Sequence, residues 1–223
     1  MRVWILAAVV IAVFVNIGAM EYRKRATGCR AYIAANQPLI AHAGGGLPDR
    51  IYANNITALD LAARHHFKVV ELDFQLVAGQ IRLGHDSLSE TTFGQLLTWL
   101  RAHPDLTVIT DAKTANVPTL TELVREAGSM KARFRPQIYS PREFKAVYML
   151  GMLKPVLTVY RIGNGWQSAA NALDVAFVTV PEQRKDEARG VRHPIYLHTV
   201  NRPMPGYGLY TDCLVPASAP TNS

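Results

Sequence analysis

The sequence contains only two cysteines, Cys29 and Cys213, one toward each end of its 223 residues. No further cysteine lies at a ligand spacing such as Cys-x-x-Cys, so the sequence does not indicate a cysteine-bound metal. A disulfide between the two thiols is compatible with the sequence but is not indicated by it.

Acidic residues are also in the minority, with 17 Asp and Glu against 24 Lys and Arg and a net charge of +7. No basic stretch is interleaved with aromatic residues, so we expect no nucleic-acid partner. The excess positive charge fits anionic lipid headgroups, a phosphate substrate or an ordinary solvated face, and composition does not choose among them. Internal repeats and low-complexity stretches are absent, and 49% hydrophobic residues suffice for one folded core.

Long hydrophobic runs are missing except at the N-terminus, where Trp4 to Met20 carries no charge. This run is close to the lower limit of roughly 17 to 25 residues for a membrane-spanning helix. The "NIGAM" stretch at its end matches a signal cleavage site poorly, so we expect a membrane anchor or an uncleaved signal. Arg23, Lys24 and Arg25 follow the run, and the positive-inside rule would keep the rest of the chain cytoplasmic. Large domains can translocate despite such charges, so the side of the membrane stays open.

The expected division of the chain has four parts. They are an N-terminal anchor or signal over residues 1–20, a basic polar linker over 21–37, a catalytic-type domain over 38–216 and a C-terminal tail over 217–223. The protein would therefore be a single-pass membrane protein, and the membrane would be one of its partners.

Within the domain, short apolar runs alternate with segments of helical periodicity. The expected strands lie within 38–45, 68–75, 106–113, 135–141, 155–162, 175–181, 193–200 and 207–214. The expected helices lie within 56–66, 89–104, 119–129, 141–151, 165–173 and 181–190. This alternation predicts a small (β/α)8 TIM barrel, with a doubly wound open sheet as the alternative.

Helix boundaries are indicated by capping residues. Ser89 and Thr119 are candidate starts, the latter with Glu122 three residues later in a capping-box arrangement. Gly128 and Gly151 are candidate stops.

Glu71 and Asp73 lie two residues apart in an apolar run, so their side chains point to the same face of a strand. An apolar core does not accept two adjacent carboxylates unless a partner is present. With Asp111 they offer hard oxygen ligands, which suit Mg²⁺ or Ca²⁺ better than zinc. A divalent cation is therefore the expected cofactor.

Other polar residues follow the expected strands, including Lys113, Gln137, Tyr139, His198 and Asp212. In a barrel the carboxyl ends of the strands form one mouth, where active sites are built. His42 and His85 titrate near neutrality and could form a proton acceptor and donor pair. We assign His65 and His66, in a helical segment, to structure.

Taken together, these stretches resemble the glycerophosphodiester phosphodiesterase family. The family pattern has a His-Arg-Gly strand end, Glu-Asn-Thr before a helix, Glu-x-Asp, a His-Asp pair and an acid-x-Lys strand. The corresponding stretches are "AHAGG", "YANNITAL", "ELDF", "LGHD" and "TDAK". The similarity runs from about residue 38 to 214, and its second half, with "PQIYSP", "LTVYR", "HTVN" and "LYTD", is more divergent.

The resemblance implies roles for individual residues. Glu71, Asp73 and Asp111 would hold the metal, with Asp111 in place of the more usual glutamate. His42 and His85 would be the acid/base pair. The residues expected to bind substrate are Lys113, Asn54, Gln137 and His198.

Two positions depart from the family pattern. Ala43 stands where the family usually has a phosphate-facing arginine. Ala53 stands where Glu-Asn-Thr begins, which leaves Asn54 as the matching residue. These departures bear on substrate identity and on affinity for phosphate.

The resulting expectation is a phosphoric diester hydrolase that cleaves glycerophosphodiesters or related lysophospholipids with a divalent cation and two histidines. The alternative is a catalytically silent, membrane-anchored barrel that binds phospholipid headgroups or a partner protein. A binding module has no need of an acid/base pair, so the two histidines favour the enzyme.

Overall fold

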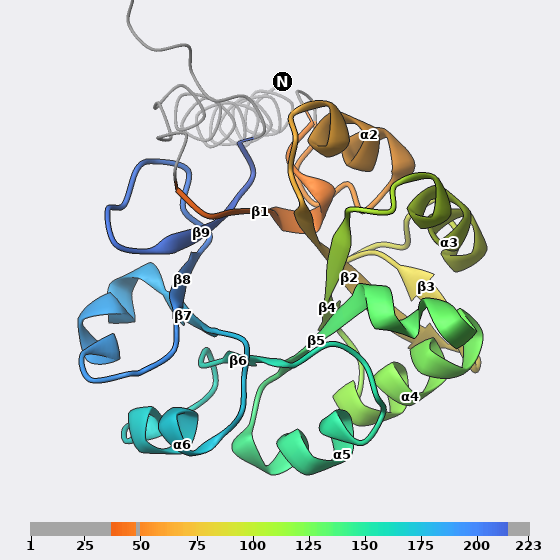
Figure 1. The fold of residues 1–223 in the computed structure, drawn as a ribbon. Helices are drawn as coiled ribbons and strands as arrows, with labels where there is room; N and C mark the ends of the chain where they lie inside the picture. The colour runs from red at the N-terminus through yellow and green to blue at the C-terminus, as the bar shows by residue number, and fades with distance from the viewer. Residues whose placement is uncertain (1–36, 48–49, 214–223) are drawn as a thin grey trace, which may run out of the picture.

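The computed structural model describes residues 37–47 and 50–213. Its sheet has nine strands in the order β1-β9-β8-β7-β6-β5-β4-β2-β3, and β1 also pairs with β2, which closes the sheet into a barrel (Figure 1). Every neighbouring pair is parallel except β2 with β3. Removing β3 leaves a closed barrel of eight parallel strands, so the expected TIM barrel is confirmed and the open sheet is not.

The elements have the following bounds. The strands are β1 Leu39–Ala41, β2 Val69–Val77, β3 Gln80–Leu83, β4 Thr107–Ala112, β5 Phe134–Ile138, β6 Val156–Thr158, β7 Val178–Pro181, β8 Ile195–His198 and β9 Gly208–Thr211. The α-helices are α2 Ile56–Arg64, α3 Phe93–Ala102, α4 Asn116–Ala127, α5 Phe144–Tyr148 and α6 Trp166–Ala172. The described residues also form four short 3-10 helices: η1 His42–Gly44, η2 Gly128–Arg133, η3 Pro141–Glu143 and η4 Glu182–Ala188.

The strands bury both faces, as parallel strands in a barrel must. On β2, Val70, Leu72 and Phe74 point outward and pack in a cluster with residues of α2, α3 and α4. Val69, on the other face, packs against a small inner cluster that contains Ile109 and other inward residues. The alternation of side chains along β2 therefore separates the apolar outer layer from the interior, which is the face that Glu71 and Asp73 share.

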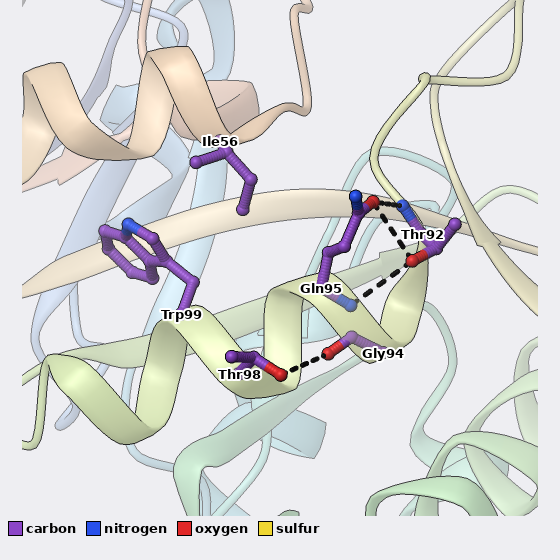
Figure 2. A pocket seen from close by; sticks show the side chains of 6 residues that line it. All are labelled: Ile56, Thr92, Gly94, Gln95, Thr98 and Trp99. Atoms are coloured by element: carbon purple, nitrogen blue, oxygen red, sulfur yellow. Dashed lines mark hydrogen bonds between the residues drawn. The ribbon is translucent and has the colours of Figure 1, made fainter.

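Two predicted helix starts are wrong. The helix after β3 begins at Phe93 rather than near Ser89, because Thr92 caps it: the Thr92 hydroxyl accepts from the Gln95 backbone, and the Gln95 side chain accepts from the Thr92 backbone (Figure 2). Thr119 is not a cap but lies inside α4, where its hydroxyl donates to the Ala115 carbonyl at 2.8 Å.

Three other details bear on the sequence expectations. Gly128 follows α4 with a φ of 54° and ends that helix as predicted. The expected helix over 181–190 is the 3-10 helix η4, and the antiparallel strand β3 was not expected. The stretch from Trp4 to Met20 and Cys29 lie outside the described residues, and among the residues that are described no helix is long and apolar enough to cross a membrane.

Candidate active site at the barrel mouth

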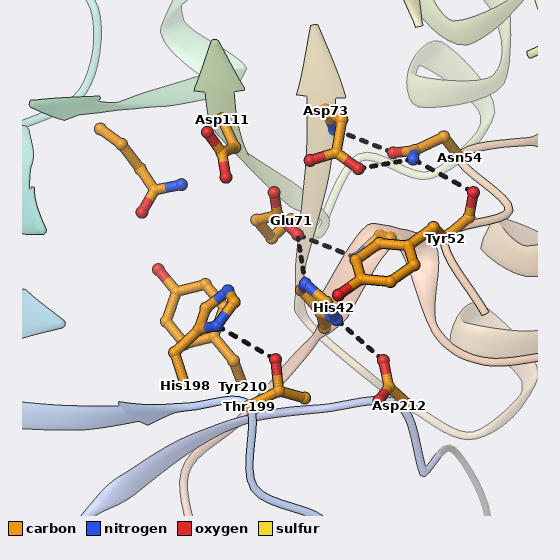
Figure 3. Close-up of polar contacts among 12 residues, drawn as sticks. His42, Tyr52, Asn54, Glu71, Asp73, Asp111, His198, Thr199, Tyr210 and Asp212 are labelled. Carbon is orange, nitrogen blue, oxygen red and sulfur yellow. Dashed lines mark hydrogen bonds and ion pairs between the residues drawn. The ribbon is translucent and has the colours of Figure 1, made fainter. Parts of the chain in front are cut away.

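The inward-facing side chains change character along the barrel axis. Toward the amino ends of the strands they form an apolar plug around Ile40, Ile109 and Tyr210. Two residues further along β1, β4 and β9 the inward positions hold His42, Asp111 and Asp212. The carboxyl ends of these strands therefore form a polar mouth (Figure 3), and the apolar cluster lies toward their amino ends.

Three carboxylates from two neighbouring strands meet in this mouth. Glu71 and Asp73 lie on β2 and Asp111 lies on β4, where parallel pairing sets Asp73 directly beside Asp111. One carboxylate oxygen of each residue lies within 4.8 Å of those of the other two. Glu71 and Asp73 are 0% and 1% exposed, so these are not carboxylates in bulk water.

The first two carboxylates are held from the loop after β1. Asn54 accepts a hydrogen bond from the Asp73 backbone N–H at 2.8 Å and donates to Asp73 Oδ2 at 2.7 Å. The Ala43 backbone N–H donates to Glu71 Oε2 at 2.8 Å, and the Asn54 backbone N–H donates to the Ala43 carbonyl at 3.0 Å. Asn54, which we expect to bind substrate, thus positions Asp73, and the backbone of Ala43 positions Glu71.

Glu71 nevertheless keeps an unused oxygen. Its Oε1 is fully buried and has no hydrogen-bond partner among the described residues. Burial and the neighbouring charge of Asp73 raise the pKa of Glu71 to about 8. A cation between these acids would offset both the cost of burying a charged carboxylate and the repulsion between neighbouring carboxylates. The three residues therefore fit a hard divalent ion.

Lys113 lies next to the carboxylates. Its Nζ is 2.8 Å from Asp73 Oδ1 and 2.8 Å from Asp111 Oδ2. Burial lowers the pKa of Lys113, but the charges of Asp111 and Asp73 raise it by more, so the ammonium stays charged. Tyr139, at the end of β5, donates its hydroxyl hydrogen to the other oxygen of Asp111.

His42 is buried on the opposite side of Glu71. Its Nδ1 lies 2.8 Å from Asp212 Oδ1 and its Nε2 lies 3.9 Å from Glu71 Oε2 (Figure 3). Burial lowers the pKa of His42, while the hydrogen bond to Asp212 and the charge of Glu71 raise it, and the net direction is upward. Asp212 is itself held by Asn201, whose amide donates to Asp212 Oδ2 at 3.2 Å.

The remaining predicted substrate-binding residues, Gln137 and His198, lie on β5 and β8. The His198 ring packs edge-on against His42 at 4.6 Å between centroids. Burial, and then repulsion by His42 and Lys113, put the pKa of His198 well below its usual range, so the ring is neutral. Gln137 is buried, and its side-chain oxygen accepts from Thr158 at 2.6 Å.

His85 lies in the loop that follows β3. The loop is bound to β2 because the Gln75 amide donates to the carbonyls of Gly84 and His85 at 2.9 and 2.8 Å. Gly84 has a φ of 132°, and a Cβ there would lie 2.0 Å from the Ser87 carbonyl oxygen, so only glycine fits. The His85 side chain is 32% exposed and its Nδ1 lies 2.8 Å from Asp86.

The two candidate acid/base residues are linked by a tyrosine that the sequence analysis missed. The Tyr52 ring lies 5.0 Å from His42 and 4.8 Å from His85, measured between ring centroids. The sequence offered no signal for it, because Tyr52 stands in a loop with a φ of 56° and belongs to no periodic element. The Tyr52 ring therefore contacts both candidate acid/base histidines.

Known structures share this fold. No protein-family model matches the sequence, and no curated protein matches it. A glycerophosphodiester phosphodiesterase structure from Parabacteroides distasonis is similar over 79% of this chain and 93% of its own, with 14% identity and a TM-score of 0.59.

Two further structures give the same result. A phosphodiesterase from Oleispira antarctica, solved with the product sn-glycerol-3-phosphate, matches over 81% of this chain and 94% of its own, with 14% identity and a TM-score of 0.57. A glycerophosphodiester phosphodiesterase from Agrobacterium tumefaciens matches over 80% and 96%, with 14% identity and a TM-score of 0.55. The chain thus has the barrel fold of these phosphodiesterases.

Proposed function

We propose that this chain is a divalent-cation-dependent phosphoric diester hydrolase that cleaves glycerophosphodiesters or related lysophospholipids. The observation that carries the proposal is the buried, unpartnered Oε1 of Glu71, which faces a site shared with Asp73 and Asp111. A binding barrel without metal chemistry has no reason to keep such a group. The fold shared with glycerophosphodiester phosphodiesterases supports the same class of reaction.

The cation site consists of Glu71, Asp73 and Asp111, whose oxygens suit Mg²⁺ or Ca²⁺. When bound, such an ion supplies charge neutralisation for the nonbridging oxygens of a phosphodiester. Lys113 uses two of its three N–H donors on Asp73 and Asp111, which leaves one for a phosphate oxygen.

His42 and His85 supply proton transfer in the proposed reaction. Asp212 accepts from Nδ1 of His42 and thereby leaves Nε2 to exchange a proton on the side that faces Glu71. His85 stands across the Tyr52 ring and serves the other oxygen of the scissile phosphate. One histidine accepts a proton from the attacking hydroxyl or water, and the other donates a proton to the leaving alkoxide.

The test is hydrolysis of a substrate panel by the purified full-length chain after treatment with a chelator. Glycerophosphocholine, glycerophosphoethanolamine and lysophosphatidylcholine are supplied with and without added Mg²⁺ or Ca²⁺, and products are followed by phosphorus NMR. We expect turnover only with cation. Asp73→Ala should lower turnover roughly a thousandfold and should abolish the calorimetric signal for cation binding.

A matched control is Asp105→Ala, which removes an exposed carboxylate that pairs with Lys68 on the outside of the barrel. This variant should behave as wild type. Cation binding without hydrolysis of any diester would contradict the proposal in favour of a silent binding barrel. Undiminished cation binding by Asp73→Ala would reject the metal site.

A further inference from the structure

The charge in the mouth is unfavourable for an anionic substrate. Four carboxylates, those of Glu71, Asp73, Asp111 and Asp212, face it. Lys113 is the ammonium ion-paired with two of them. For the three carboxylates of the candidate metal site, a divalent ion and Lys113 would together supply three positive charges against three negative ones, which leaves no excess positive charge for an anion. A phosphodiester carries a further negative charge, so its binding calls for another cation.

Arg161 lies at this mouth. It follows β6, the neighbour of β5 in the barrel, and its Cζ lies 5.9 Å from the centre of the Tyr139 ring. The hydroxyl of the same tyrosine donates to Asp111. The Arg161 guanidinium therefore rests on the ring that borders the candidate metal site, at a distance where a cation and an aromatic face attract each other.

The turn that carries Arg161 is fixed on both sides. Arg184 donates through Nη1 to the carbonyls of Val159 and Ile162, at 2.8 and 2.9 Å. Tyr160 donates its hydroxyl hydrogen to the His198 carbonyl at 3.1 Å. Arg161 is thus presented by an ordered turn, which limits the entropy lost when its side chain binds a ligand.

The two arginines of this region differ in how their donors are used. Arg184 is engaged by Glu187 and by the backbone of the turn. Arg161 is exposed, and its guanidinium has no hydrogen bond or ion pair with any residue in the described part of the chain. Ala43, on the far side of the mouth, is fully buried and carries no charge. Arg161 thus has a planar set of donors to offer at the mouth.

We propose that Arg161 binds the phosphate of the substrate, with its forked N–H groups on the nonbridging oxygens. This assignment rests on the proposed phosphodiesterase function and adds the residue that compensates the acidic mouth. A guanidinium suits this role because it is always charged and matches phosphate geometry with two parallel hydrogen bonds.

The test compares Arg161→Gln with wild type in the presence of saturating Mg²⁺ or Ca²⁺. Calorimetric titration with sn-glycerol 3-phosphate should show binding weakened by about ten- to a hundredfold, the range for a lost charge-assisted hydrogen bond. Glycerol, which lacks the phosphate, serves as the uncharged comparison ligand. Arg161→Lys should recover only part of the affinity, because a lysine keeps the charge but not the fork. KM for glycerophosphodiesters should rise more than kcat falls.

Arg101→Gln is the control, since it removes the same charge from an exposed position in the last turn of α3. Equal affinity for sn-glycerol 3-phosphate in Arg161→Gln and Arg101→Gln would overturn the role of Arg161 while hydrolysis by wild type still upheld the proposed function. If wild type neither hydrolyses a diester nor binds the phosphate, the proposed function itself fails, and the role of Arg161 falls with it. Thermal unfolding of each variant confirms that it is folded.

Discussion

Two parts of the barrel mouth are built by different means. The floor, which we define as His42, Glu71, Asp73 and Asp111, lies on β2 and β4 and directly after β1, and its members are buried or half-buried. The rim, which we define as Tyr52, His85 and Arg161, lies on loops and is partly exposed. Hydrogen bonds fix the side chains of the floor. The side chains of the rim contact neighbouring rings, while hydrogen bonds from Gln75 and Arg184 hold two of the loops that carry them.

This difference separates two tasks. Oxygens that must meet one cation need fixed positions, and strands provide them because parallel pairing sets neighbouring residues at a constant spacing. A substrate must enter and leave past the rim, so partly exposed side chains on loops suit contacts that form only with ligand present. We therefore expect His42, which is buried in the floor, to contribute to both stability and activity, and the rim to contribute to activity alone.

Replacement of the two histidines gives the largest effect and the most direct test of this separation. His42→Ala and His85→Ala should each lower kcat by ~10²–10⁴-fold, the usual contribution of one general acid or base. Only His42→Ala should also lower the thermal midpoint, because it leaves a cavity and removes a partner from Asp212. Activity assays and thermal unfolding of both variants provide the comparison.

His65→Ala is the control, since that histidine ends α2 on the outside of the barrel. Equal thermal destabilisation by His42→Ala and His85→Ala would contradict the division into floor and rim. Normal turnover in either variant would exclude that histidine from proton transfer.

The floor was predictable from the sequence. Alternation along a strand places Glu71 and Asp73 on one face, and closure of eight parallel strands brings Asp111 and His42 to the same end. The eight strands of the barrel were all expected within a few residues of their positions. Periodicity carries this information because it repeats over several residues.

The rim was less predictable because loop geometry is not periodic. Tyr52 owes its place to a left-handed backbone conformation, and Arg161 owes its place to a turn held by the distant Arg184. The contact between Asn54 and Asp73 depends on how the loop after β1 folds back over β2. Long-range contacts of this kind have no local sequence signature.

The hydrogen bond from His42 to Asp212 provides a test of smaller expected effect. Asp212→Asn keeps the size of the side chain but gives it an amide that can donate to Nδ1, which leaves the ring proton on Nε2, so the nitrogen on the Glu71 side can no longer accept one. We expect kcat to fall by roughly ten- to a hundredfold with KM nearly unchanged, because the substitution acts through the orientation of His42.

Asp174→Asn is the matched control, because that aspartate is exposed and pairs with Lys154 away from the mouth. It should leave kcat unchanged. An Asp212→Asn enzyme with a raised KM and unaltered kcat would show that Asp212 serves substrate binding and not the orientation of His42.

The smallest effect is expected from replacing Glu187, which pairs with Arg184 and so supports the turn of Arg161 from outside the mouth. Hydrogen bonds from Arg184, and then from Trp166, lower the pKa of Glu187 to about 2 from an ordinary value of 4.5. A carboxyl group whose pKa is lower in the folded than in the unfolded state stabilises the fold fully when the pH is above its unfolded pKa. This stabilisation is lost as the pH falls from 4.5 toward 2. Glu187→Gln should therefore lower the thermal midpoint by roughly 1 to 3 °C at pH 7. The difference should vanish as the pH approaches 2.

The same substitution should loosen the turn that carries Arg161, because Arg184 loses the partner that orients it toward Val159 and Ile162. Hydrogen exchange at the Ile162 amide should accelerate in Glu187→Gln and not in Glu122→Gln, whose ion pair with Arg125 lies within α4. The affinity of Glu187→Gln for sn-glycerol 3-phosphate should also fall. The fall should be smaller than in Arg161→Gln, because the Arg161 guanidinium is still present. If exchange accelerates while affinity stays at the wild-type value, the order of this turn does not contribute to phosphate binding, and Arg161 acts through its charge alone.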